Sequence, residues 1–149
     1  MKLLFETTVE QSLENVRAGF TQELFEALNP PGMKAQVLRF DGCKKGDEVH
    51  LELQSFFGKK DPWVSIITEE KSTPHEWHFV DEGRVLPWPL KTWRHTHRVV
   101  KENEKESRII DDIHYTCGPA FMGPLISPAL WLAFAVRPFR YRQFFRKQT

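Results

Sequence analysis

Six runs of β-forming residues follow one another between residues 35 and 116, and a long aromatic segment comes after them. Turn signals such as Asp41-Gly42, Lys45-Gly46 and Ser72-Thr73-Pro74 separate the runs at intervals of roughly ten residues, which is typical of an antiparallel meander. The runs are Gln36–Phe40, Val49–Phe56, Trp63–Glu70, Glu76–Glu82, Thr92–Lys101 and Arg108–Thr116. A sheet of this kind must bury one apolar face against another element.

Further elements are predicted ahead of the meander. Lys2–Val9 alternates apolar and polar residues, which predicts a half-buried strand. Ser12 is a good N-cap, and apolar residues at helical spacing follow it as far as Asn29-Pro30-Pro31-Gly32, which stops any helix. We therefore expect one strand and then two short helices before the six strands.

The last part of the chain predicts a loop and a long helix. Residues 117–128 are rich in glycine and proline and are expected to form the loop. Ala129–Lys147 is expected to form the helix, and Pro138 should kink it. We expect this helix to be buried on much of its circumference, because apolar and aromatic residues dominate it. The residues that recur at helical spacing are Leu130, Phe134, Arg137, Tyr141 and Phe144.

Together these elements predict an α+β fold in which a seven-stranded curved antiparallel sheet surrounds the C-terminal helix. The sheet and the helix each present an apolar face, and the curved arrangement lets each bury the other. Curled sheets that hold a wide helix often leave a pocket between the two layers. The chain has 149 residues, which suits one domain, so we assign 1–149 to a single domain.

The charge distribution argues against some partners. There are 21 Lys and Arg residues against 20 Asp and Glu residues, and no basic stripe is interleaved with aromatic residues, so we expect no nucleic acid. The segment from Ile113 to Thr149 has no acidic residue. Its basic side chains can stabilise the helix end and keep it soluble, and a weak contact with an anionic surface is the alternative. These basic residues are Arg137, Arg140, Arg142, Arg146 and Lys147.

The uncharged stretch Ile113–Val136 is long enough to raise the question of a membrane span. Five glycine and proline residues interrupt it, so we expect no span.

Cys43 and Cys117 lack a metal-binding spacing and are expected to be free thiols. The N-terminal residues are too acidic for a signal peptide, and we therefore expect a cytoplasmic location.

Strand parity identifies the side chains that should face the helix. In Thr92–Val100 one face carries two histidines and a tryptophan, while the other carries two arginines, which belong in water more often. Applying the same parity to the neighbouring strands places two carboxylates beside the two imidazoles. The residues placed on the inner face are Trp77, Phe79, Asp81, Trp93, His95, His97, Asp111 and Tyr115.

Three interpretations of this Asp–His cluster remain open. It can be a hydrogen-bonded polar core, a patch that orients a ligand, or a general acid–base pair. The candidates for catalytic roles are His95, His97, Asp81 and Asp111. The pair His95 and His97 on one strand could also hold zinc or iron, but no third ligand stands at a recognisable spacing, so we expect no metal and no cofactor.

Several motifs lie at the predicted strands and the helix. They are Phe79-Val80-Asp81-Glu82, Trp93-Arg94-His95-Thr96-His97-Arg98, Asp111-Asp112-Ile113-His114-Tyr115, Gly123-Pro124-Leu125 and Phe139-Arg140-Tyr141-Arg142. In this order they resemble bacterial ligand-binding proteins of the SRPBCC group, in the START/Bet v 1-like superfamily, over essentially the whole chain. The resemblance implies a helix-grip fold with a hydrophobic cavity under the C-terminal helix. It carries over no catalytic residue.

We therefore expect a carrier or sensor that binds a small, largely hydrophobic molecule. An enzyme of the polyketide cyclase, dehydratase or hydrolase kind, with an Asp–His pair moving protons, is the alternative, although the sequence contains no nucleophile motif. A protein-interaction module without a ligand is the third hypothesis. The residues expected to contact the ligand are Trp77, Phe79, Trp93, His95, His97, Tyr115, Phe134 and Tyr141.

Overall fold

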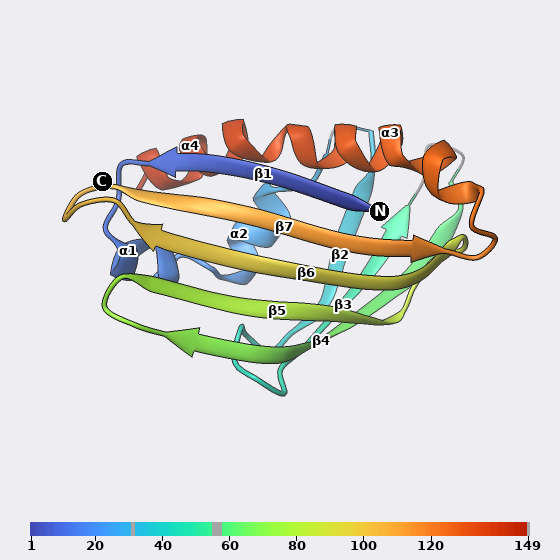
Figure 1. The fold of residues 1–149 in the computed structure, drawn as a ribbon, viewed down its shortest axis with the longest axis horizontal. Coiled ribbons are helices and arrows are strands. Elements are labelled where there is room, and N and C mark those ends of the chain that lie inside the picture. The colour runs from blue at the N-terminus through green and yellow to red at the C-terminus, as the bar shows by residue number, and fades with distance from the viewer. Residues whose placement is uncertain (31, 55–57, 149) are drawn as a thin grey trace.

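The computed structural model describes residues 1–30, 32–54 and 58–148, which form a curved seven-stranded sheet and four helices (Figure 1). The strands are β1 Lys2–Val9, β2 Lys34–Phe40, β3 Glu48–Gln54, β4 Lys60–Ser72, β5 Glu76–Val85, β6 Leu90–Lys101 and β7 Ser107–Cys117. The helices are α1 Leu13–Ala18, α2 Gln22–Ala27, α3 Met122–Ala135 and α4 Arg137–Arg146. The predicted strand Val49–Phe56 corresponds to β3, and its last two residues lie outside the described residues.

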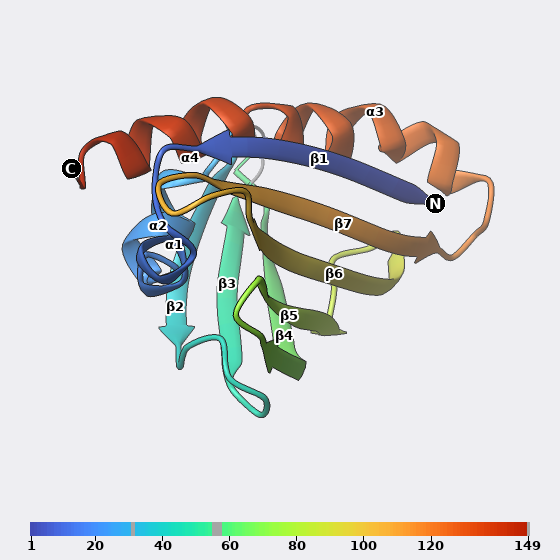
Figure 2. The ribbon, with the colours of Figure 1, turned by 60° about the vertical axis from the view of Figure 1, so that its left-hand side comes forward.

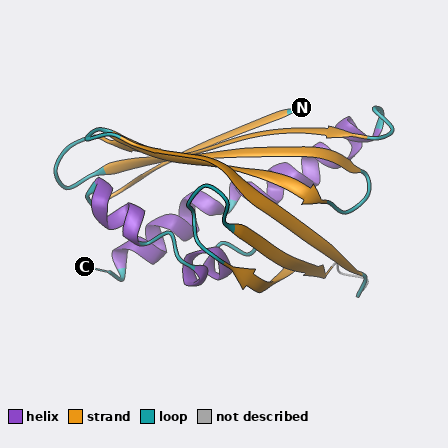
Figure 3. Ribbon diagram, turned by 90° about the horizontal axis from the view of Figure 1, so that it is seen from below, coloured by secondary structure: helices purple, strands orange, loops and turns teal. Residues whose placement is uncertain are grey.

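The strand order is β1-β7-β6-β5-β4-β3-β2, and all neighbouring strands are antiparallel. Strands β2 to β7 form the predicted meander, whereas β1 pairs with β7 at the opposite edge from β2. The connection from β1 to β2 therefore runs from one edge of the sheet to the other, and it carries α1 and α2. Register shifts between β2 and β3, β4 and β5, and β6 and β7 bend the strands. Figure 3 shows the sheet curling around the helices.

The two short helices close one end of the curled sheet. Ser12 caps α1, because its hydroxyl accepts a hydrogen bond from the backbone N–H of Asn15 at 3.2 Å. Val16 and Leu24, one from each helix, are fully buried. They pack in a core that includes Trp77 from β5 and helix α4. A second core lies under α3 and contains Trp93, Ile113, Tyr115 and Phe134.

The C-terminal helix begins earlier than predicted, at Met122 rather than at Ala129. Pro124 lies in the first turn of α3, where a helix needs no backbone donor. Pro128 lies inside the helix on its exposed side, and the hydroxyl of Ser127 donates a hydrogen bond to the carbonyl of Gly123 at 2.7 Å. The prediction of a loop over 117–128 was therefore wrong for its second half, because Pro124 is tolerated in the first turn and the helix continues through Pro128.

The kink predicted at Pro138 is a break. Helix α3 ends at Ala135, Val136 joins the two segments, and α4 starts at Arg137 with Pro138 in its first turn. A proline is tolerated at this position because its missing N–H would have no partner there. Figure 2 shows α3 and α4 running along the whole length of the sheet, with β1 beside them.

Candidate functional site

A cavity of about 300 Å³ lies between the concave face of the sheet and the helices. Leu51 and Trp63 line it from β3 and β4, and Ile126 and Leu130 line it from α3. Most of the lining is apolar. The charged and imidazole groups in the wall are Asp81, His95, His97 and Arg137.

The polar part of the wall is built on neighbouring strands. In the register, Asp81 of β5 lies opposite His95 of β6, and His97 lies opposite Asp111 of β7. The hydrogen bonds run diagonally between these pairs. The Nε2 atom of His95 lies 2.8 Å from Oδ1 of Asp111, and Nε2 of His97 lies 3.2 Å from Oδ2 of Asp81. Long side chains reach diagonal partners across an antiparallel ladder, so the sheet itself fixes this arrangement.

Asp111 is the most enclosed carboxylate of the cluster, with a side chain that is 2 % exposed. Arg137 and Tyr141 of α4 add their donors at 3.4 Å each. Burial acts to raise the pKa of Asp111, but the hydrogen bond from His95 and the charge of Arg137 outweigh it and hold the pKa well below its usual value. Burial and the charge of Asp111 raise the pKa of Tyr141, so its phenol remains a donor.

In the second hydrogen-bonded pair, Asp81 and His97, burial and neighbouring charges shift the pKa values of both groups. Burial and the nearby His95 lower the pKa of His97 to about 4, although Asp81 and Asp111 act in the opposite direction. The imidazole of His97 is therefore neutral near pH 7. Burial acts to raise the pKa of Asp81, but the hydrogen bond from His97 and the surrounding imidazoles lower it on balance. Among the described residues, Oδ1 of Asp81 and Nδ1 of His97 are buried atoms without a hydrogen-bond partner.

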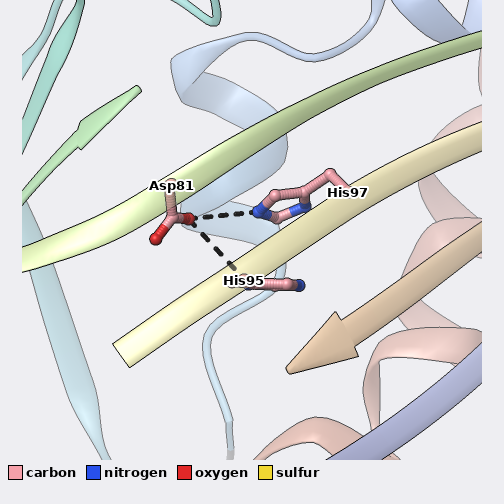
Figure 4. Close-up of side chains that lie close together, drawn as sticks. All are labelled: Asp81, His95 and His97. Atoms are coloured by element: carbon pink, nitrogen blue, oxygen red, sulfur yellow. Dashed lines mark hydrogen bonds and ion pairs between the residues drawn. The ribbon is translucent and has the colours of Figure 1, made fainter. Parts of the chain in front are cut away.

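The cluster could also hold a metal ion. Asp81, His95 and His97 each offer one ligand atom, and the three atoms lie within 4.8 Å of one another (Figure 4). The figure shows the two rings on one strand and the carboxylate on the next strand. This third donor comes from a neighbouring strand and not from a nearby sequence position, which is why sequence spacing did not reveal it.

The structure divides the predicted ligand contacts into two groups. Five of them line the cavity, namely Phe79, Trp93, His95, His97 and Phe134. Trp77, Tyr115 and Tyr141 are not among its lining residues and lie instead in the packed core. Strand parity and helical spacing select an inward side chain, but they do not tell whether its neighbours cover it. Asp111 faces inward as predicted and lies behind the histidines.

The sequence did not suggest a role in this site for Arg137, because it is one of five basic residues that follow one another near the C-terminus. Its guanidinium lies over the ring of Phe134 at 4.0 Å and contacts Asp111. A signal was present, since Arg137 recurs at helical spacing with Phe134 and Tyr141. A charged residue on an otherwise apolar helical face indicates a buried partner.

No protein-family model matches the sequence, and no curated protein sequence is significantly similar to it. Solved structures are similar in shape. A START superfamily protein from Mycobacterium smegmatis superposes with a TM-score of 0.71 at 12% identity, covering 99% of each chain. A protein from Chromobacterium violaceum has a TM-score of 0.70 at 15% identity, covering 97% of each chain. A hypothetical protein from Helicobacter pylori has a TM-score of 0.72 at 12% identity, covering 98% of this chain and 88% of that one.

The superpositions extend over nearly the whole chain, and the meander, the crossover helices and the C-terminal helix are all present. At these identities the likeness establishes the fold and leaves the ligand and any reaction open. The chain therefore has the START/Bet v 1-like helix-grip fold.

Proposed function

We propose that this protein binds a small, largely hydrophobic molecule in the cavity between the sheet and α3. The observation that carries the proposal is the apolar cavity of about 300 Å³ with one polar region in its wall. This volume is at the lower end of the range for small-molecule sites, and such sites combine apolar walls with a few placed polar groups.

The energetics allow useful affinity. Burying roughly 300 Å² of apolar ligand surface at about 25 cal/mol per Å² gives about 7.5 kcal/mol before the costs of association are subtracted. The result is consistent with micromolar binding only if the polar region contributes as well. Asp81, His95 and His97 are placed to orient a polar end of the ligand, while the aromatic wall holds its apolar body.

A pair of variants tests the proposal with a neutral fluorescent probe, N-phenyl-1-naphthylamine. Leu130→Trp fills space at the cavity wall, and Leu38→Trp makes the same change at a side chain that is 60% exposed on β2. We expect the wild type and Leu38→Trp to bind one equivalent of probe, and Leu130→Trp to bind it at least about tenfold more weakly, because one lost pocket contact is worth 1–3 kcal/mol.

Thermal unfolding of each variant shows whether the fold is retained. Equal probe binding by the wild type and a folded Leu130→Trp would contradict the proposal, as would the absence of stoichiometric binding to the wild type.

We also propose a cytoplasmic location, because Cys43 and Cys117 are free thiols and such thiols are maintained in a reducing compartment.

A further inference from the structure

The distances within the Asp–His cluster suit a bound cation. Oδ2 of Asp81 lies 3.2 Å from Nε2 of His97 and 3.9 Å from Nδ1 of His95. In a tetrahedral site with bonds of about 2.05 Å, ligand atoms lie about 3.4 Å apart. These two separations lie on either side of that value, and all three ligand atoms lie within 4.8 Å of one another.

Polar atoms of the cluster that lack close partners also favour a cation site. Nδ1 of His95 lies 3.9 Å from Oδ2 of Asp81, which is too long for a hydrogen bond. Oδ1 of Asp81 is buried and has no hydrogen-bond partner among the described residues. Buried polar groups without partners are unfavourable, and a cation beside Asp81 would give its carboxylate a further partner.

Asp111 is placed to support both imidazoles from behind. It accepts the proton on Nε2 of His95 at 2.8 Å, and its Oδ1 lies 3.5 Å from Nδ1 of His97. When a metal occupies Nε2 of His97, the remaining ring proton is on Nδ1, which has no hydrogen-bond partner within the described part of the chain and lies nearest to Asp111 at 3.5 Å. Histidine ligands commonly donate their other N–H to a carboxylate that orients them. Arg137 and Tyr141 in turn hold Asp111 in place.

We propose that Asp81, His95 and His97 bind a divalent transition-metal ion of the zinc or ferrous class, with Asp111 orienting the two histidines. Two imidazoles and one carboxylate are ligands that these ions accept, and three protein ligands leave a position open. The three residues line the cavity, so this open position faces the space where a ligand would bind. The metal site does not depend on the proposed ligand, because the ion can be titrated alone.

The experiment uses chelator-treated full-length protein titrated with Zn²⁺ by calorimetry and with Co²⁺ by visible absorption. We expect one ion per chain and a rise in the melting temperature. Asp81→Asn and His97→Gln should weaken binding by more than about 100-fold, and Asp111→Asn by about 10–100-fold. His78→Gln is the matched control, because His78 lies beside Glu69 and Glu76 and does not line the cavity.

The absence of a bound equivalent at micromolar Zn²⁺ would overturn the proposal, and so would unchanged affinity in a folded Asp81→Asn variant. Loss of binding in His78→Gln alone would assign the ion to the protein surface. Should a cluster variant fail to fold, the Co²⁺ spectrum of the wild type still reports nitrogen ligation directly. Zinc binding without probe binding would leave the metal site standing and remove the carrier function.

A second inference concerns the outer side of the C-terminal helices. We predicted that the helix would be buried on much of its circumference, but within Met122–Ala135 only Gly123 and Phe134 are buried. Large side chains repeat along the outer side at helical spacing, and in Figure 2 no described element covers that side of α3. We call these side chains the outer ridge; they are Phe121, Leu125, Leu132 and Phe139, and each is more than 60% exposed.

The outer ridge continues into a basic end. Arg142 and Lys147 are exposed beyond Phe139, and no acidic residue occurs from Ile113 onward. By length and composition alone, Met122–Arg146 could cross a membrane. Its inner side, however, lines the cavity and supplies Arg137 to Asp111, which is expected for a helix that belongs to the fold. An apolar ridge with a basic end is typical of helices that lie in the surface of an anionic membrane.

We infer that the outer ridge and the basic end bind an anionic lipid surface, with α3 and α4 lying flat in the headgroup region. The cationic end complements lipid phosphates, whereas it would repel the same end of a second copy packed in parallel. In this orientation α3 separates the bilayer from the cavity, since its inner side forms the cavity wall. A lipophilic molecule could then be exchanged across one helix.

Sedimentation with vesicles of phosphatidylglycerol and phosphatidylcholine tests this inference. The wild type should bind these vesicles and should bind pure phosphatidylcholine more weakly. Leu132→Glu should reduce binding at least about tenfold, because it places a charge in the headgroup and acyl boundary. Leu38→Glu is the matched control, as Leu38 is equally exposed on β2 at the far edge of the sheet. Failure of the wild type to bind, or a stable dimer that Leu132→Glu dissociates, would refute it.

Discussion

Replacing Arg137 by methionine tests whether the cluster is held together by charge. The guanidinium of Arg137 lies 3.4 Å from the buried carboxylate of Asp111, and its removal takes a positive charge away from that carboxylate. Removing one partner of a buried ion pair costs roughly 3–5 kcal/mol. The 3.4 Å separation and the 15 % exposure of Arg137 place the cost at the low end of this range. Loss of the contact with Phe134 adds about 0.5–1 kcal/mol.

We therefore expect Arg137→Met to lower the free energy of unfolding by about 3.5–4 kcal/mol, which is the sum of the two costs. For a chain of this size the melting temperature should fall by about 7–16 °C. Urea unfolding in the presence of a chelator measures the change without a contribution from metal. Arg142→Met is the control on the same helix, and it should change stability by less than about 0.5 kcal/mol because Arg142 is exposed.

A double-mutant cycle with Asp111→Asn shows whether the stability lost in Arg137→Met comes from charge or from packing. Asparagine keeps the shape of the side chain and its acceptor for His95 but removes the charge that Arg137 balances. Arg137→Met should therefore cost about 2 kcal/mol less in the Asp111→Asn background than in the wild type. Additive effects, within about 0.5 kcal/mol, would refute the reasoning and would attribute the loss in Arg137→Met to packing.

Three further predictions concern stability and thiol reactivity. Gly19→Ala would place a Cβ atom 2.5 Å from Cε1 of the buried Phe145 ring, so it should destabilise by about 1–3 kcal/mol in urea unfolding, and unchanged stability would show that the ring can move. Ile113→Ala removes a side chain that is 0% exposed, so a loss of about 2–5 kcal/mol is expected, and a smaller loss would mean that the surroundings collapse. Burial raises the pKa of Cys43 to about 12, so the thiol is protonated at pH 8 and iodoacetamide should modify it far more slowly than free glutathione. Peptide mapping by mass spectrometry measures that rate, and equal rates would disprove the burial argument.

The succession of strands along the chain, and the side of each strand that faces inward, could be predicted from local sequence patterns. Alternation in Thr92–Val100 placed His95 and His97 inside, and their side chains are 3 % and 1 % exposed. This works because side chains alternate between the two faces of a strand whatever its neighbours are. The position of the long helix followed from its aromatic content, since such a surface needs a partner.

Local sequence patterns gave wrong predictions where the burial of a side chain depends on how neighbouring elements pack. The outer side of α3 is as apolar as its inner side, so composition predicted burial around the helix, yet Leu125 and Leu132 are 67% and 63% exposed. The prolines at 124 and 128 suggested a loop because their effect depends on position within the helix and on access to water. The same local patterns placed Tyr115 and Tyr141 inside without showing that other side chains separate them from the cavity.

The sequence by itself determined the run of strands, the C-terminal helix and the inward direction of Asp81, His95 and Asp111, because these follow from the periodicities of a strand and a helix. Only the tertiary structure decided which side chains meet. The pairing of β5 with β6 brings Asp81 to His95, and the docking of α4 brings Arg137 to Asp111. Register and helix docking depend on contacts between residues far apart in the chain, and no local spacing specifies them.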